Sequence, residues 1–328
     1  MKIILTLLLS VAVVTACFAQ NYSNEIEKTA KEGDPVAQYQ LAMAYAMGRN
    51  VKQSNSSAVL WMEKSASQGY KPAMNKIASF YYNLNMFDKS IEWYTKQAND
   101  GDIMAEYWLG HCYYNQNDGP SSIKWFEKAA SRDDDSTWSV TASYNIGEMY
   151  AEGKVVETNF DSALKWFKKA ALKIHRGAMT EIDKIYYYNL CKEESELDKR
   201  FWCRKLADDG FKSGFNGLGE MYMKEKDYER AYQMFSKAIE KKNNTAVGSL
   251  GEMYYYGYYV EKNYEKAFSL LKQSAADTDC PNANAMRLLA ACYRYGLGVE
   301  KDQIQEKQWM DKAAQHKDSK AMNILGLQ

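Results

Sequence analysis

Small and apolar side chains recur along the chain with the spacing of an α-helix. In each recurring segment, a small residue is followed by an aliphatic residue four positions later, usually a second small residue at the fifth position, and a tyrosine at the eighth. Offsets of four and eight lie on one face of a helix, so each segment predicts a first helix, helix A. The segments start at Ala37, Ala73, Ala105, Ala142, Ala178, Gly214, Ala246 and Ala285, and a partial ninth starts at Ala321.

A second helix, helix B, is predicted in each repeat from a bulky residue that follows the start by 20 or 24 positions. The longer spacing occurs mostly where a glycine-containing loop follows helix A, and a glycine at a helix end favours a left-handed cap. Each helix pair carries an apolar stripe that it cannot bury alone, so neighbouring pairs are expected to stack. The pattern therefore predicts an all-α solenoid of about eight helix–turn–helix repeats. The bulky residues are Trp61, Trp93, Trp125, Trp166, Trp202, Met234, Leu270 and Trp309, and the loop glycines are Gly48, Gly153, Gly257 and Gly296.

Some segments depart from the repeat. In the fifth repeat, Asp183 stands where the others have a small residue, and the loop glycine is replaced by Asn189, so its turn between the helices is left open. Extra residues at 133–135 and around Cys280 and Pro281 are predicted to be surface insertions. Residues 24–33 are expected to form a leftover helix B that caps the N-terminal end.

The recurring pattern A-x3-L-G-x2-Y-x2-G-x2-V…A-x2-W-x2-K-A-A resembles the Sel-one-like repeat, a longer relative of the tetratricopeptide repeat. Residues 142–171 match almost every position, and the resemblance covers roughly residues 24–328. It implies a right-handed superhelix that serves as an adaptor, often in envelope assembly or signalling.

The N-terminus predicts export. Lys2 precedes a nearly unbroken apolar run over residues 3–14, and Cys17 and Ala19 occupy the small positions of a cut before Gln20. Residues 1–19 therefore predict a secretory signal peptide, and residues 20–328 the mature solenoid. A second interpretation stays open, because residues 14–17 also resemble a bacterial lipobox that would leave a lipid anchor on Cys17. The expected location is a bacterial periplasm or the exterior, and no later apolar run is long enough for a transmembrane segment.

Composition narrows the choice of partners. Lysine plus arginine and aspartate plus glutamate number 42 each, and no basic block or stripe indicates nucleic-acid binding. Five cysteines remain after Cys17, an odd number that does not favour a disulfide framework. Cys112 and Cys292 occupy an apolar position of helix A and Cys203 an apolar position of helix B, so these three are expected to be buried thiols. A bridge between Cys191 and Cys203 is disfavoured by the hairpin geometry. A bridge between Cys280 and Cys292, which have the same spacing in the sequence, is not expected either.

An enzymatic function is an alternative, because some exported, cysteine-rich relatives of the repeat family have been labelled β-lactamases. Ser121-x-x-Lys124, Ser143-Tyr144-Asn145 and Lys212-Ser213-Gly214 match the three short motifs of serine β-lactamases in the right order. Those motifs must converge from a helix, a loop and a sheet edge, and no strand is predicted here. The histidines at 111, 175 and 316 lie in different repeats and make no metal-ligand pair. The sequence predicts no catalytic site, no metal and no cofactor.

By analogy with tetratricopeptide-like stacks, the second, sixth and ninth positions after each repeat start are expected to line a concave groove. The tyrosines and glutamates there suit an extended peptide or a helix. Alternatively, the tyrosines pack between repeats and the glutamates are simply solvated. The predicted function is a non-catalytic protein-interaction scaffold that binds a protein or peptide, and a carbohydrate or cell-wall binder is the alternative. The candidate groove residues are Tyr39, Tyr82, Tyr107, Tyr114, Tyr144, Glu148, Tyr187, Glu220, Glu252 and Tyr255.

Overall fold

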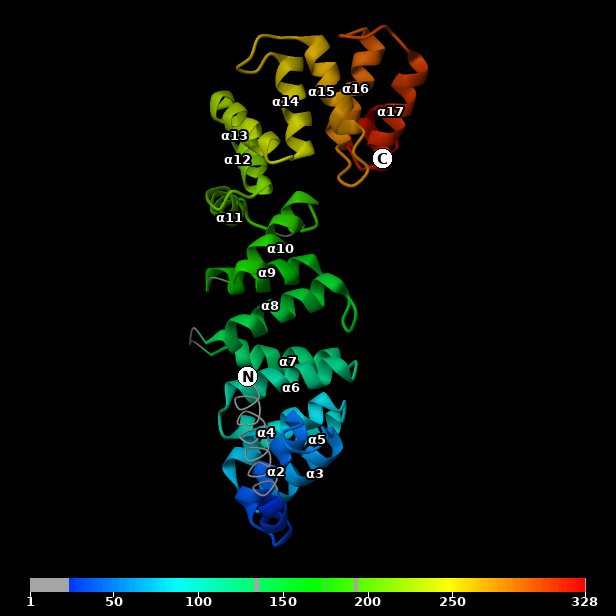
Figure 1. The fold of residues 1–328 in the computed structure, drawn as a ribbon. Coiled ribbons are helices and arrows are strands. Elements are labelled where there is room, and N and C mark those ends of the chain that lie inside the picture. Colours follow the sequence, from blue (N-terminus) through cyan, green and yellow to red (C-terminus); the bar gives the residue numbers. More distant parts are fainter. Residues whose placement is uncertain (1–23, 133–135, 174, 192–193, 328) are drawn as a thin grey trace, which may run out of the picture. The chain divides into compact units, whose positions relative to one another are not determined.

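The computed structural model describes residues 24–132, 136–173, 175–191 and 194–327, and every regular element in these ranges is a helix (Figure 1). The predicted all-α fold is confirmed for this part of the chain, which contains no strand. None of the described helices combines the length and apolarity needed to span a bilayer. The expected signal peptide, residues 1–19, and its Cys17 lie outside the described residues.

The chain divides into two compact units between Thr158 and Asn159. In the first unit the helices are α2 (Pro35–Met47), α3 (Asn55–Ser67), α4 (Lys71–Asn83), α5 (Phe87–Asn99), α6 (Ile103–Asn115), α7 (Gly119–Ala130) and α8 (Thr137–Glu152). In the second unit they are α9 (Phe160–Leu172), α10 (Arg176–Tyr187), α11 (Glu196–Asp208), α12 (Lys212–Lys224), α13 (Tyr228–Glu240), α14 (Asn244–Tyr256), α15 (Tyr264–Ala275), α16 (Ala283–Tyr295), α17 (Gln303–Gln315) and α18 (Ser319–Leu325).

Each predicted repeat start lies in the first turns of a helix A, most often at its third residue. Asp34 precedes α2 and its carboxylate accepts a hydrogen bond from the Ala37 amide at 2.7 Å. Asn282 caps α16 in the same way, accepting from the Ala285 amide at 3.0 Å. Such caps satisfy amides that have no partner within the helix. In these two repeats, the polar residue three positions before the repeat start therefore caps helix A.

The small residue at the fifth position of a repeat lets an aromatic ring of helix B sit against the helix A backbone. A Cβ atom added at Gly110 of α6 would lie 2.6 Å from the ring of Phe126 of α7. In the second unit, a Cβ added at Gly219 of α12 would lie 2.5 Å from the Phe235 ring of α13. Both rings are fully buried. Helices A and B of these repeats thus approach too closely for any side chain at that position.

The longer loops have the predicted caps. Gly48, Gly153, Gly257 and Gly296 end α2, α8, α14 and α16 in the left-handed region, with φ between 65° and 78°. This backbone conformation costs glycine little and a side-chain-bearing residue more.

Residues 24–31 are helical and cover the first repeat, as expected of a terminal cap. Ala30 is buried in one cluster with Ala37 and Leu41 of α2. The side chain of Gln38 donates a hydrogen bond from its Nε2 to the carbonyl oxygen of Ala30 at 3.1 Å.

In the fifth repeat, Asp183 has a structural role that accounts for the departure from a small residue at this position. Asp183, which replaces the usual small residue on α10, accepts hydrogen bonds from the amide and the hydroxyl of Ser213 at 3.0 and 2.5 Å. Ser213 belongs to the first turn of α12, so Asp183 caps the helix A of the next repeat from outside its own sequence.

Three of the cysteines are packing residues, as predicted. Cys112, Cys203 and Cys292 are buried, and burial raises the pKa of each thiol, to about 11 for Cys112 and about 12 for the other two. A thiol with so high a pKa holds little reactive thiolate near neutral pH.

Candidate functional site

A hollow of about 270 Å³ lies over helices α6 and α8 in the first unit, and we call it the α6–α8 hollow. Both helices are helices A of their repeats, and the sequence predicts the groove on the helix A faces. Tyr114, Phe126 and Met149 form its apolar walls. Its polar lining is His111, Asn145, Glu148, Glu152 and Lys154.

His111 and Asn145 form a polar pair in the hollow. The Asn145 side-chain nitrogen lies 3.0 Å from His111 Nε2 and 3.4 Å from the hydroxyl oxygen of Tyr107. Burial lowers the pKa of His111 to about 4, so its imidazole is neutral near pH 7. The hollow therefore offers a neutral amide and imidazole, groups that can hydrogen-bond a peptide backbone.

Aromatic rings form a continuous row beneath this pair, from α4 through α6 to α8. Tyr82 packs edge-on against Trp108 with ring centroids 5.1 Å apart, and Trp108 meets Tyr107 at 5.6 Å. Tyr107 in turn contacts His111 at 4.7 Å and Trp138 at 5.0 Å. The ring contacts of Tyr107 and Trp108 thus hold the imidazole of His111 in place at the hollow.

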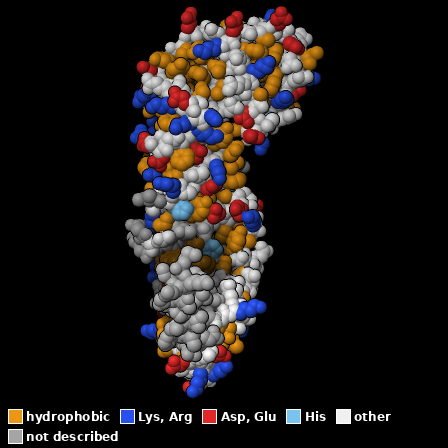
Figure 2. Space-filling view, in the orientation of Figure 1, with side chains coloured by type: hydrophobic (Ala, Val, Ile, Leu, Met, Phe, Trp, Pro, Cys, Tyr) orange, Lys and Arg blue, Asp and Glu red, His pale blue; other side chains and the backbone are white. Residues whose placement is uncertain are grey.

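Acidic groups dominate the charge at the hollow. Glu148 is partly buried, and Glu152 is more exposed and pairs with Lys154 at 2.9 Å. This side of the hollow therefore presents two carboxylates and one ammonium group. On the face drawn in Figure 2, hydrophobic side chains alternate with both signs of charge rather than with one sign alone.

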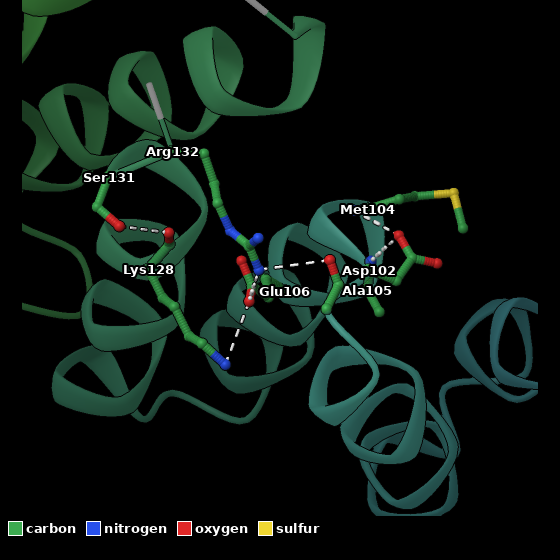
Figure 3. A network of polar contacts seen from close by, with 8 residues as sticks. Asp102, Met104, Ala105, Glu106, Lys128, Ser131 and Arg132 are labelled. Atoms are coloured by element: carbon green, nitrogen blue, oxygen red, sulfur yellow. Dashed lines mark hydrogen bonds and ion pairs between the residues drawn. The ribbon is translucent and has the colours of Figure 1, made fainter. Parts of the chain in front are cut away.

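A buried ionic cluster fixes α6 against the end of α7. Glu106 has a fully buried side chain, and its Oε1 accepts from Arg132 at 2.8 Å and lies 3.2 Å from Lys128 Nζ (Figure 3). Arg132 also reaches the carbonyl oxygen of Gly101 at 3.4 Å, and the nearby Asp102 caps the start of α6. The cluster holds the helix that carries His111 and Tyr114 in a fixed register.

The candidate groove residues of the first unit do not all line one surface. Tyr114 and Glu148 line the α6–α8 hollow, and Tyr39 lines a second hollow of about 380 Å³ beside α2. Tyr82 and Tyr144 are partly buried. Tyr107 differs from the rest, because it is only 8% exposed and packs between α6 and α8. The packing interpretation therefore holds for Tyr107.

In the second unit, Tyr187 and Glu220 line a larger pocket of about 400 Å³. Glu252 lies on α14, where its Oε2 accepts from Asn284 at 2.9 Å. Tyr255 packs against Tyr256 and Tyr264 with centroids 4.9 and 5.7 Å apart. These four residues are partly buried, and none stands free of its neighbours.

The three short motifs that match serine β-lactamases all lie in helices here. Ser121 lies in the first turn of α7, where its amide donates to the cap residue Asp118. Ser143 is buried in α8 and its hydroxyl donates to the Ser139 carbonyl oxygen at 3.1 Å. Lys212 opens α12 and its ammonium lies 3.4 Å above the Tyr187 ring. Within the described ranges no group of histidine, cysteine and acidic residues is arranged to hold a metal ion.

Two asparagines that line the pockets, Asn145 and Asn216, are not among the residues predicted from the sequence. Asn145, three positions after its repeat start, is one step away from the register used to select groove residues. Asn216 does lie at the second position of the sixth repeat, and it lines the pocket of the second unit. The register includes Asn216, but the candidate groove residues were limited to tyrosine and glutamate.

Comparison with protein families matches the Sel1 repeat model to residues 35–70, 103–134, 140–175, 247–279 and 283–318, which together make up more than half of the chain. A tetratricopeptide repeat model matches residues 214–244. Both models fall on the helix pairs described above.

Curated relatives are similar over limited stretches. Human protein sel-1 homolog 2 is 37% identical over 92 residues, which cover 28% of this chain and 13% of that protein. The ERAD-associated E3 ubiquitin-protein ligase component HRD3B of Arabidopsis thaliana is 22% identical over 249 residues, covering 74% of this chain and 36% of that protein. A Helicobacter pylori protein named putative beta-lactamase HcpC is 44% identical over 50 residues, covering 15% and 17%. The chain thus matches much less than two thirds of the length of each relative.

Proposed function

Because the chain belongs to the Sel1 repeat family, we propose that it is a non-catalytic scaffold that binds other proteins through the helix A faces of its repeats. Stacked helical repeats build extended surfaces without a catalytic pocket, and such surfaces suit peptide and protein ligands. HRD3B, whose name describes a component of a ubiquitin-protein ligase, supports an assembly role for a related chain.

The observation that carries this proposal is the α6–α8 hollow. Its neutral imidazole and amide match the hydrogen-bonding groups of a peptide backbone, and its walls of Tyr114, Phe126 and Met149 match an apolar side chain. Glu148 adds a negative charge at one side. We propose that an extended peptide segment of a partner lies along α6 and α8.

A peptide-display selection on the full chain, followed by titration of the selected peptide, tests this function. Replacing Tyr114 with Ala together with Glu148 with Gln should weaken binding at least tenfold, since a wall and a charge of the hollow are lost. The matched control is Glu127→Gln on the exposed surface of α7, which should bind as the wild type does. Selected peptides that bind both variants equally well would place the binding surface elsewhere.

The non-catalytic part of the proposal is supported by the engagement of Ser143 and Lys212 in helix structure. The resemblance to a named putative beta-lactamase covers 15% of the chain and brings no strand to carry the third motif. Turnover of nitrocefin by the purified chain, abolished by Ser121→Ala, would overturn this part of the proposal.

Exposed tyrosines favour carbohydrate binding as a second candidate function. In the second unit Tyr256, Tyr259 and Tyr295 are 40%, 55% and 58% exposed. Exposed aromatic rings can stack on the apolar faces of sugar rings. Binding to a glycan and peptidoglycan panel that is lost in a Tyr256→Ala and Tyr259→Ala double variant would establish this function in place of peptide binding.

We also propose that the chain is exported and acts in a bacterial envelope or outside the cell. The support is the apolar run at residues 3–14 with small residues before Gln20. Mass spectrometry of the mature N-terminus in the native cell tests it. A chain that begins at Gln20 indicates an ordinary signal peptide, a lipidated Cys17 indicates an anchor, and a retained Met1 would refute export.

A further inference from the structure

The second unit contains a pocket of about 400 Å³, which we call the α12 pocket, over the helix A faces of α10, α12 and α14. Asn216 and Glu220 of α12 line it, with Lys199 of α11 at its edge. Part of its wall is the connection 276–282 between α15 and α16. The sequence predicts only a surface insertion around Cys280 and Pro281.

Hydrogen bonds hold the connection 276–282 over the helix A faces. Asp277 accepts a hydrogen bond from the Asn244 side chain at 2.8 Å, and its other oxygen accepts from the amides of Asp279 and Cys280 at 2.9 and 3.1 Å. The Cys280 thiol then donates to the carbonyl oxygen of Tyr187, 93 residues earlier in the chain, at 3.3 Å.

This contact is unusual for a repeat protein. Repeats normally touch only their nearest neighbours in the stack. Here a segment that precedes the eighth repeat reaches the end of α10 in the fifth. A plain surface insertion needs no such anchors, whereas a wall that narrows a binding pocket does.

One acceptor in the pocket lacks a donor. Asn216 donates from Nδ2 to Glu220 Oε1 at 2.9 Å, and this bond does not use the Asn216 Oδ1 atom. This oxygen is buried and accepts no hydrogen bond from the described residues. A buried acceptor without a donor costs free energy that a ligand can recover.

The negative charge of Glu220 is only partly compensated by its surroundings. Burial raises the pKa of its carboxyl group, although the charges of Lys199 and Lys224 and the hydrogen bond from Asn216 all act in the opposite direction. Neither lysine donates a hydrogen bond to it among the described contacts. A cation that entered the pocket would meet a carboxylate whose charge is only partly balanced.

We propose that the α12 pocket binds a guanidinium or ammonium group on a flexible chain, with Glu220 as its counter-ion and Asn216 Oδ1 as a further acceptor. The group is an N–H donor with a positive charge, so it can donate to the unpartnered Asn216 oxygen and also pair with the Glu220 carboxylate. The cavity is large enough for one such side chain or small amine. This inference is independent of peptide binding by the α6–α8 hollow.

Titrating the full chain with N-acetyl-arginine amide and N-acetyl-lysine amide, followed by NMR, tests the proposal. The neutral control is N-acetyl-citrulline amide, which has nearly the shape of the arginine probe without its charge. We expect saturable binding of at least one cationic probe and at least tenfold weaker binding of citrulline. No saturable binding of either cation, or equal binding of citrulline, would overturn the proposal.

Matched variants locate the binding. Glu220→Gln should weaken binding of the cationic probe at least tenfold, while Glu252→Gln, at the same position of the next repeat and outside the pocket, should not change it. Lys199→Met should strengthen binding because it removes the competing cation. Should Glu220→Gln melt early, Asn216→Leu serves in its place. Unchanged affinity in both pocket variants contradicts the assignment.

A final arm identifies the source of the cation. The arginine probe is compared with a five-residue peptide that carries arginine between alanines. Tighter binding of the peptide indicates a side chain of a protein partner, and equal binding indicates a small amine. Both outcomes uphold the pocket chemistry, and neither depends on the Tyr114 and Glu148 variants that test the proposed function.

Discussion

The carboxylate of Glu106 accepts a hydrogen bond from Arg132 at 2.8 Å, but the two side chains experience different surroundings (Figure 3). The Glu106 side chain is 0% exposed, whereas that of Arg132 is 39% exposed. Lys128, 47% exposed, lies on the same carboxylate oxygen at 3.2 Å. One buried anion is therefore served by two cations that water also reaches.

This arrangement predicts strong coupling between the two cations. Arg132→Met or Lys128→Met alone should lower the free energy of unfolding by about 1 kcal/mol, because the second cation still compensates Glu106. The double variant leaves a buried anion without a partner and should lose roughly 3–5 kcal/mol. A double-mutant cycle by urea unfolding measures the excess, and strictly additive losses would show that the cations act independently.

The close approach at Gly110 predicts the cost of a single methyl group. In Gly110→Ala the new Cβ would lie 2.6 Å from the buried Phe126 ring, so the ring or the helix must shift. We expect a loss of about 1–3 kcal/mol in the free energy of unfolding. The matched control is Gly251→Ala, whose new Cβ would lie 3.0 Å from its nearest neighbour, the Leu271 side chain, and should cost less because this contact is longer. Thermal melts of both variants check the order, and equal losses would contradict it.

The repeat could be predicted because its spacing is a direct record of packing. Ala105, at the start of a repeat, and Leu109, four positions later, are fully buried. Gly110, at the fifth position, leaves room for a ring of the next helix. Residues that face the same neighbour in every repeat must keep the same size. The cap residue Asp34 marks the start of α2, and it can be recognised in the sequence once the register is known.

The candidate site was less predictable because it depends on departures from the repeat. α8 starts at Thr137, five residues before Ala142, whereas α6 starts only two residues before Ala105. The additional turn brings Trp138 onto Tyr107, which buries a residue that the regular register predicts to be in the groove. In the second unit, the contact of Cys280 with Tyr187 joins segments too far apart in the sequence for any periodicity to indicate it.

The different burial of two groove tyrosines predicts different losses of stability. Tyr107→Ala removes a ring that is held by Trp138 and His111, so we expect a loss of roughly 3 kcal/mol or more in the free energy of unfolding. Tyr114→Ala, at the wall of the hollow, should cost about 1 kcal/mol or less. Urea unfolding of the two variants gives the comparison. If Tyr114→Ala were the more destabilising change, the hollow would be part of the core.

The buried imidazole of His111 predicts a pH-dependent loss of stability. Burial lowers its pKa from 6.5 to about 4 in the folded chain, so between these values the unfolded chain binds a proton that the folded chain does not. The free energy of unfolding must then fall as the pH is lowered from 6.5 towards 4, by on the order of 2–3 kcal/mol, with no further contribution from this group below pH 4. Above pH 6.5 both states are neutral and the group contributes no slope.

Because carboxylates titrate in part of the same range, the measurement is a difference between variants. His111→Gln keeps an amide that can face Asn145 but cannot titrate, so its unfolding free energy should depend less on pH between 4 and 6.5 than that of the wild type. Parallel curves for the wild type and His111→Gln would mean that water reaches the imidazole in the folded chain, and that the α6–α8 hollow offers a ligand a protonatable group rather than a neutral one.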